Sequence, residues 1–195
     1  MCEISNNVDE LIKLGFAPLL KTYRFRKSGR TFYRQVDEIW QVLNVQSSQS
    51  NFGLIEKFTI NLGIYHPIIA QLAGKSFSTG YPKEYECTIR KRIGHLMQSQ
   101  GDYWWEIDPS TNLEVLAKQV NSTVEEFGLP WLETHCDLRV IANTLSEQPS
   151  IMSAAAALAL GDKLMAQQRL ARMIIERPMA ANTARSWANK QGLET

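Results

Sequence analysis

Apolar and polar residues alternate without a break from residue 58 to residue 64. Because successive side chains of a strand point to opposite faces, Phe58, Ile60, Leu62 and Ile64 share one face. The alternation predicts a strand, and we expect all four side chains to be buried against helices. A register shift of one residue would expose all four together, so the pattern leaves little freedom in register.

Four further segments have the composition of strands and are bounded by turn-forming residues. They cover residues 30–36, 39–46, 87–93 and 103–107. The first two are close enough to form a hairpin around Asp37 and Glu38. Together with residues 58–64, they predict a five-stranded antiparallel meander.

Helical spacing precedes and follows the predicted strands. Ile4, Val8, Leu11 and Ile12 predict a first helix, which Gly15 is placed to end in a left-handed turn.

After the last predicted strand, Thr111 and Glu114 have the spacing of a capping box, and an apolar stripe continues to Gly128. Pro130 suits the first turn of a next helix. An antiparallel sheet packed by separate helices is an α+β fold.

The composition changes at Pro149. Residues 150–160 and 163–177 predict an Ala-rich helical hairpin that turns at Gly161 and Asp162, and a last helix holds Trp187. We therefore predict two parts: an α+β domain over residues 1–148 and an all-helical extension over residues 149–195.

Cysteine usage and hydropathy predict a cytoplasmic protein. Three cysteines are an odd number without close pairing, which favours a reducing compartment. The first residues are polar and do not resemble a secretory signal. The most apolar run, residues 154–160, is far shorter than the roughly 20 residues of a membrane span. We expect no membrane association, no cofactor and no metal.

The net charge of +1 conceals blocks of opposite sign. Basic residues are concentrated before residue 100, and acidic residues between 101 and 148. Such asymmetry indicates either a patch for an anionic partner or two complementary faces within the fold. The balanced overall charge favours the second interpretation, because nucleic-acid-binding domains usually carry a basic excess.

The second face of the predicted sheet collects polar side chains at alternate positions on neighbouring strands. Side chains of this kind lie within reach of one another and suit an anionic or heteroaromatic ligand. The alternative is a solvated sheet face. The candidate ligand-binding residues are Asn44, Gln46, Asn61, Arg90, Arg92, Trp104 and Glu106, with Thr59 beside them. We expect the two arginines to lie side by side with Glu106 as a counter-charge.

Catalytic and metal-binding patterns are weak in this sequence. Cys87 precedes His95 by eight residues, but Cys87 falls on an apolar alternation and is predicted to be a buried small hydrophobe. His66, His135 and Cys136 lack the close paired spacing of zinc sites. The isolated Gly63 is expected to mark a bulge or a close approach of backbones.

Residues 21–34 form a basic stretch interleaved with aromatic residues. The basic residues are Lys21, Arg24, Arg26, Lys27, Arg30 and Arg34, and the aromatic ones are Tyr23, Phe25, Phe32 and Tyr33. Charge for phosphates and rings for bases is the composition of a surface for single-stranded nucleic acid. The favoured interpretation is an edge strand that lysine and arginine protect from aggregation.

Several motifs in a fixed order resemble one family. They are Gly15-Phe16, RTFYR at 30–34, Gln46-Ser47-Ser48, FTINLGI at 58–64, CTIRKRIG at 87–94, DYWWEI at 102–107 and Gly128-Leu129-Pro130. Over about residues 11–138 the chain resembles the bacterial family known as domain of unknown function 4304. The resemblance implies the fold and a bacterial origin, and it carries no activity.

Two function classes follow. The first hypothesis is a non-catalytic bacterial binding or interaction protein, with an unknown protein or an anionic ligand as its partner and a possible immunity or defence role. The alternative is an enzyme acting on nucleic acid or a phosphorylated small molecule. It would use Arg90 and Arg92 for phosphate, Glu106 as base and His66 as acid.

Overall fold

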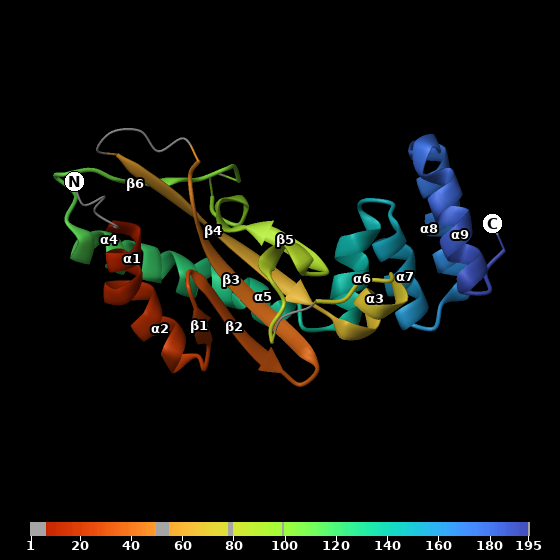
Figure 1. Cartoon of the computed structure of the whole chain (residues 1–195), viewed down its shortest axis with the longest axis horizontal. Coiled ribbons are helices and arrows are strands. Elements are labelled where there is room, and N and C mark those ends of the chain that lie inside the picture. The colour runs from red at the N-terminus through yellow and green to blue at the C-terminus, as the bar shows by residue number, and fades with distance from the viewer. Residues whose placement is uncertain (1–6, 50–54, 78–79, 99, 195) are drawn as a thin grey trace.

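The chain folds around one antiparallel sheet, in a computed structural model that describes residues 7–49, 55–77, 80–98 and 100–194. Cys2 and Ile4, which entered the sequence predictions, lie outside these residues. The α+β fold predicted from the sequence is confirmed. The strands are β1 (Arg26–Ser28), β2 (Thr31–Val36), β3 (Ile39–Ser47), β4 (Glu56–Tyr65), β5 (Ile89–Arg92) and β6 (Trp105–Ile107) (Figure 1).

The last strand departs from the predicted meander. Strands β1 to β5 follow one another across the sheet, but β6 pairs with β4 and not with β5. β5 occupies the edge of β4 at Asn61–Ile64 and β6 occupies the same edge at Glu56–Phe58. Between them the chain leaves the sheet, and two parts of this connection approach closely, since a Cβ on Gly94 would lie 2.4 Å from the carbonyl oxygen of Gly101.

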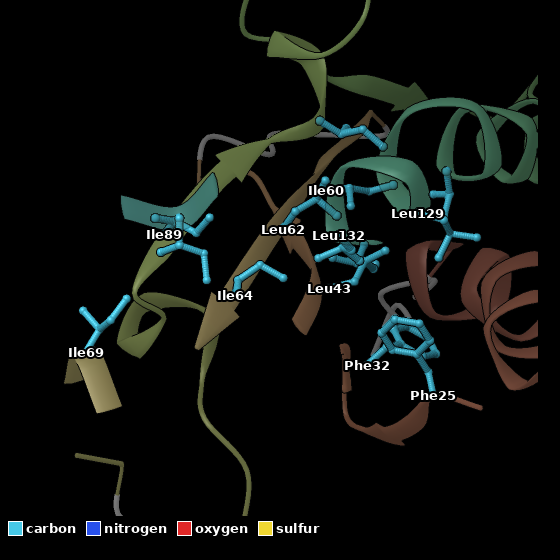
Figure 2. Close-up of a cluster of buried hydrophobic side chains, with 14 of the residues drawn as sticks. Phe25, Phe32, Leu43, Ile60, Leu62, Ile64, Ile69, Ile89, Leu129 and Leu132 are labelled. Atoms are coloured by element: carbon cyan, nitrogen blue, oxygen red, sulfur yellow. The ribbon is translucent and has the colours of Figure 1, made fainter. Parts of the chain in front are cut away.

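One face of the sheet forms the main core. Phe58, Ile60, Leu62 and Ile64 are all 0% exposed, which confirms the burial predicted from their alternation. Figure 2 shows Ile60, Leu62 and Ile64 of β4 in one cluster with Leu129 and Leu132 of the helical layer, with Phe25 and Phe32 at one end.

Two bent helical rods cover this face. The first comprises α1 (Asn7–Leu11), a π-helical turn (Ile12–Phe16) and α2 (Ala17–Thr22), and the second comprises α4 (Leu113–Thr123), a π-helical turn (Val124–Gly128) and α5 (Leu129–Thr134). The N-cap of α4 is Asn112, whose side chain accepts from Glu114 N and Val115 N, while Thr111 bonds to Asp108. The cap therefore lies one residue after the position predicted from the capping-box spacing.

The predicted helix ends at Gly15 and Gly128 are wrong, because both rods continue through these glycines. A proline follows each glycine, at Pro18 and Pro130, and proline removes a backbone donor and crowds the preceding turn. The π turn before each proline widens the helix and keeps it continuous. Gly15 instead allows close packing, since a Cβ there would lie 3.0 Å from Ala117 Cβ.

The second face of the sheet is partly covered by the connection between β4 and β5. This connection contains α3 (Pro67–Leu72) and a 3-10 turn (Glu84–Glu86). Val42, Tyr65 and Cys87 form a second apolar cluster there, packed by Phe77. A Cβ on Gly63 would lie 2.6 Å from Cys87 Sγ, so Gly63 marks the close approach expected from the sequence.

The C-terminal helices gather at one end of the sheet beside α3 (Figure 1). They are α6 (Leu138–Ser146), α7 (Ile151–Ala159), α8 (Lys163–Glu176), a 3-10 turn (Pro178–Ala180) and α9 (Ala181–Lys190). Elsewhere in the chain, a further 3-10 turn (Ile93–His95) follows β5. α7 packs on both α3 and α6, and Trp187 Nε1 donates to the Leu72 carbonyl at 2.8 Å. The extension is therefore joined to the sheet domain through a continuous apolar core.

Candidate functional site

The polar residues predicted on the second face form hydrogen bonds among themselves. Asn61 Nδ2 donates to Gln46 Oε1 at 2.7 Å, and Arg92 Nε donates to Asn61 Oδ1 at 3.2 Å. Asn44 Nδ2 donates to Thr31 Oγ1 at 2.9 Å. Thr59 and Asn61 are buried, so this part of the face is not the open polar surface that alternation predicts. Thr59 Oγ1 donates to the carbonyl of Tyr103, which belongs to the connection between β5 and β6.

The charged members of this predicted site are each paired. Arg90 forms two hydrogen bonds to the carboxylate of Glu84, at 2.6 and 3.0 Å, and Arg92 Nη1 lies 2.5 Å from Asp102 Oδ1. Glu106 pairs with Lys57 across the β4–β6 ladder. The expectation that Glu106 neutralises the arginines is therefore wrong. On β4, the residues that pair with β6 end at Phe58 and those that pair with β5 begin at Asn61, so Glu106 lies opposite Lys57 and not beside the arginines.

Trp104 completes the Arg92 group. Its Nε1 donates to Asp102 Oδ2 at 3.3 Å, and the Arg92 guanidinium lies 5.3 Å from its ring centroid. The hydrogen bond from Arg92 lowers the pKa of the Asp102 carboxyl, which therefore stays ionised at neutral pH. A network in which each charge already has a partner holds the β5–β6 loop in place.

The histidines and cysteines considered for catalysis have structural surroundings. His66 is buried at the N-cap of α3, where Nδ1 accepts from Ile69 N, and burial lowers its pKa. His135 stacks on Trp131. Cys87 is buried as predicted, and burial raises the pKa of its thiol. In the described ranges, no three His, Cys, Asp or Glu side chains are grouped so that they could hold a metal ion.

A different group of residues surrounds a hollow of about 680 Å³ at the edge of β2. β1 pairs with β2 only from Arg26 to Ser28, so the last residues of β2 have no neighbour on that side among the described strands. We call this hollow the arginine pocket. It is lined by Thr22, Tyr23, Arg24, Arg26, Tyr33, Arg34, Gln35, Val36, Trp40 and Gly80.

Arg24 reaches the pocket from a left-handed turn at the end of α2. Its φ is 62°, and the bonds Arg24 N to Lys21 O and Phe25 N to Leu20 O form a Schellman motif. Glycine is the usual residue at this position, because a side chain in the left-handed region costs about 1–2 kcal/mol. A strained non-glycine residue beside a hollow favours a functional interpretation.

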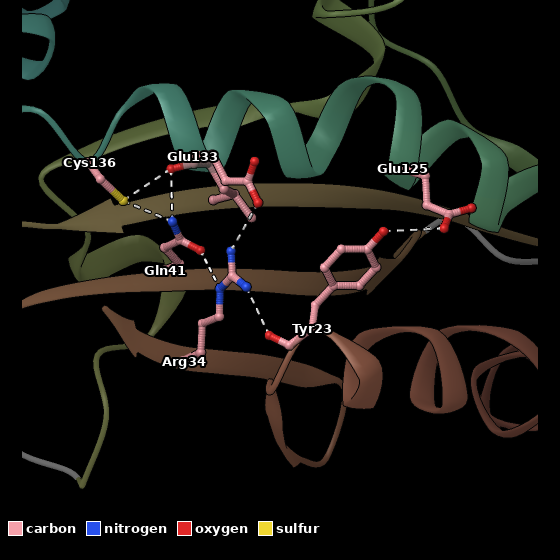
Figure 3. Close-up of polar contacts among 7 residues, drawn as sticks. Tyr23, Arg34, Gln41, Glu125, Glu133 and Cys136 are labelled. Carbon is pink, nitrogen blue, oxygen red and sulfur yellow. Dashed lines mark hydrogen bonds and ion pairs between the residues drawn. The ribbon is translucent and has the colours of Figure 1, made fainter. Parts of the chain in front are cut away.

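Hydrogen bonds to neighbouring elements hold the Arg34 guanidinium in place, as Figure 3 shows. Its Nε donates to Gln41 Oε1 at 2.6 Å and its Nη1 to the Tyr23 carbonyl at 2.8 Å. Gln41 is 1% exposed and donates in turn to the Leu132 carbonyl. The bond to Tyr23 ties β2 to the turn that presents Arg24, so the wall of the pocket is organised before any ligand arrives.

Aromatic rings line the side of the pocket formed by the second face of the sheet. Arg26 lies opposite Tyr33, and Gln35 lies opposite Trp40, so these four side chains share that face. The Tyr33 and Trp40 ring centroids are 6.3 Å apart. Tyr33 also stacks on Tyr81 at 3.9 Å, and a hydrogen bond from Lys83 lowers the pKa of Tyr81.

The charge of the pocket is unbalanced. Arg24 and Arg26 are exposed, and within the described part of the chain their side chains have no hydrogen bond or ion pair. Besides its hydrogen bonds to Gln41 and Tyr23, Arg34 forms an ion pair with Glu133 at 3.6 Å. No acidic residue lines the hollow. Two or three guanidinium groups around one space favour an anionic occupant.

Part of this pocket was visible in the sequence as the basic and aromatic stretch at residues 21–34. The favoured interpretation there, an edge strand protected from aggregation, accounts for the charge but not for the hollow. Gln35, Val36, Trp40 and Gly80 were missed. The register of the β2–β3 hairpin would have placed Trp40 beside Tyr33, whereas no sequence signal brings Gly80 to this edge.

Comparisons with known proteins place the chain in a family without assigning an activity. No curated protein and no solved structure matches it. None of the helices in the described residues is both long enough and apolar enough to cross a membrane. A family model matches residues 16–134, which include all six strands and the whole lining of the arginine pocket. The chain therefore belongs to the family described as domain of unknown function (DUF4304).

Proposed function

We propose that this protein is a non-catalytic binding protein whose arginine pocket takes an anionic ligand. The observation that carries the proposal is the gathering of Arg24, Arg26 and Arg34 around a hollow that no acidic side chain lines. Two further observations support the proposal. The left-handed backbone at Arg24 costs stability, and a hydrogen bond to the Tyr23 carbonyl anchors Arg34, so both positive charges are held in place at the hollow.

The enzymatic alternative receives less support from the arrangement of its residues. Glu106 is paired with Lys57, and His66 caps α3. Arg90 and Arg92 are engaged by Glu84 and Asp102. These groups do not converge on one space that a substrate could occupy.

The cellular setting belongs to the same proposal. We place the protein in a bacterial cytoplasm, where an immunity or defence role would suit a small binding domain. The free thiols of Cys87 and Cys136 support a reducing compartment.

Calorimetric titration with inorganic tripolyphosphate tests the proposal. We expect saturable binding that weakens with added salt, and a loss of about tenfold or more in the variant Arg24→Gln/Arg26→Gln, because each charged hydrogen bond is worth about 1.5–3 kcal/mol. Arg139→Gln/Arg185→Gln is the matched control, since it removes two exposed charges that are not part of the pocket lining. Equal affinity in both variants, or no binding by the wild type, would refute the site.

A further inference from the structure

The arginine pocket combines two kinds of surface, and only one of them is explained by a simple anion. The guanidinium groups of Arg24 and Arg26 suit the negative charge of an anionic ligand. A simple anion gives no role to the rings of Tyr33 and Trp40, which are both partly exposed at the same hollow. Exposed rings beside unpaired arginines form the combination that binds nucleotides, because a base stacks on the ring while the phosphate meets the cation.

The register of the hairpin gives this combination a definite layout. Arg26 and Tyr33 are direct neighbours across β1 and β2, and Gln35 and Trp40 are direct neighbours across β2 and β3. All four lie on one face, and the two that belong to β2, Tyr33 and Gln35, are two residues apart. The Gln35 amide is exposed and supplies both a donor and an acceptor, as the edge of a base requires.

The surroundings restrict where a base can lie. Tyr81 covers one face of the Tyr33 ring in a parallel stack, with Lys83 over the far side of Tyr81. Phe77 meets Trp40 edge-on, with ring centroids 5.9 Å apart. The cluster is thus supported from the covered side of the sheet, and Trp40 is the ring best placed to receive a base from the hollow.

We infer that the arginine pocket binds a nucleotide, free or within a single strand, with its phosphate on Arg24 and Arg26 and its base against Trp40. This inference rests on the proposed function and specifies the chemical class of its anionic ligand. Lys21 is exposed next to the pocket along the chain, and it provides charge for a neighbouring phosphate if the nucleotide is part of a strand.

The test compares ligands that share phosphates and differ in bases. Wild-type protein is titrated at low salt with a fluorescent octathymidylate, with an abasic octamer of the same phosphate number, with thymidine monophosphate and with tripolyphosphate. We expect the octathymidylate to bind at least about fivefold more tightly than the abasic octamer, because stacking of a single base on an aromatic ring is worth that much or more. This comparison needs no variant and so does not depend on how a variant folds.

Variants then assign the stacking to one ring. Trp40→Leu should reduce the affinity for octathymidylate to that for the abasic octamer and leave the abasic affinity unchanged. Trp104→Leu is the control, because Trp104 is a partly exposed tryptophan outside the pocket. Thermal unfolding checks that both variants are folded.

The outcomes separate this inference from the proposed function. If the two octamers bind equally well and Arg24→Gln/Arg26→Gln weakens the binding of both, the nucleotide inference is refuted and the proposed anion site stands. Failure of every probe to bind overturns both. If the monophosphate binds as tightly as octathymidylate, the nucleotide is a free one; tighter binding of the octamer indicates a single strand.

Discussion

Arg24 occupies a backbone position at which proteins usually place glycine. Its left-handed φ of 62° is imposed by the Schellman end of α2, and the Arg34 bond to the Tyr23 carbonyl holds the turn in place. The side chain that causes the strain is the one that carries charge into the pocket. Stability and binding should therefore respond in opposite directions when this residue is changed.

Replacing Arg24 with glycine should stabilise the fold and weaken binding. The relieved strain of about 1–2 kcal/mol exceeds the extra flexibility of glycine in the unfolded chain, about 0.5–1 kcal/mol. The net gain of about 0.5–1 kcal/mol should raise the Tm by about 1–4 °C, and the tripolyphosphate affinity should fall. Arg26→Gly, at an ordinary strand position, should lower both. A lower Tm for Arg24→Gly would contradict the strain, and unchanged affinity would contradict the contact.

At the scale of elements, prolines and caps decide how the helices continue. The two π turns carry the rods past Pro18 and Pro130, so each rod keeps one apolar face against the sheet. Helix α3 begins with Pro67 and is capped by the imidazole of His66. This cap works only while Nδ1 is unprotonated, because a protonated nitrogen cannot accept the Ile69 N–H.

The His66 cap should make stability depend on pH. Burial lowers the pKa of His66 in the folded protein, so the unfolded chain binds more protons as the pH falls through about 6.5. Stability is therefore fully present above that pH and decreases below it. His66→Asn keeps a capping side chain and removes the titration. Denaturant unfolding between pH 7.5 and 5 should show a shallower decrease for this variant; an unchanged decrease would assign the effect to other groups such as His135.

For the whole molecule, the question is how the C-terminal helices relate to the sheet domain. The family match ends at residue 134, within α5, whereas the apolar core continues through α3, α6 and α7. Ala154, Ala155 and Ala156 are fully buried at that junction. The extension thus adds burial to a sheet that already has the two rods α1–α2 and α4–α5 on its main face.

We predict that a chain ending at Gln148 stays folded with a lower Tm. The rods and the sheet bury the β4 side chains without the extension, but the surfaces of α3 and α6 that face α7 become exposed. A second chain ending at Gly161 retains α7 and should recover part of the lost Tm. Thermal unfolding followed by circular dichroism measures both, and the absence of a cooperative transition in the shorter chain would show that α7 completes the core.

The sequence by itself determined the features that depend on local periodicity. The burial of Phe58, Ile60, Leu62 and Ile64 and the antiparallel hairpin of β2 and β3 follow from alternation and from a two-residue turn, both of which act over a few residues. The close approach at Gly63 and the burial of Cys87 were also predictable, because residue type and strand phase are sufficient. The basic and aromatic character of residues 21–34 was visible in the same way.

Only the tertiary structure decided which distant residues meet. The return of β6 to β4, the pairing of Arg90 and Arg92 with Glu84 and Asp102, and the cover over the second face all depend on the paths of long connections. The arginine pocket likewise arises where a helix end, a short edge strand and a hairpin converge. Periodicity constrains the face of each residue within its own element, whereas the packing of separate elements sets the distances between them, and no local pattern encodes those distances.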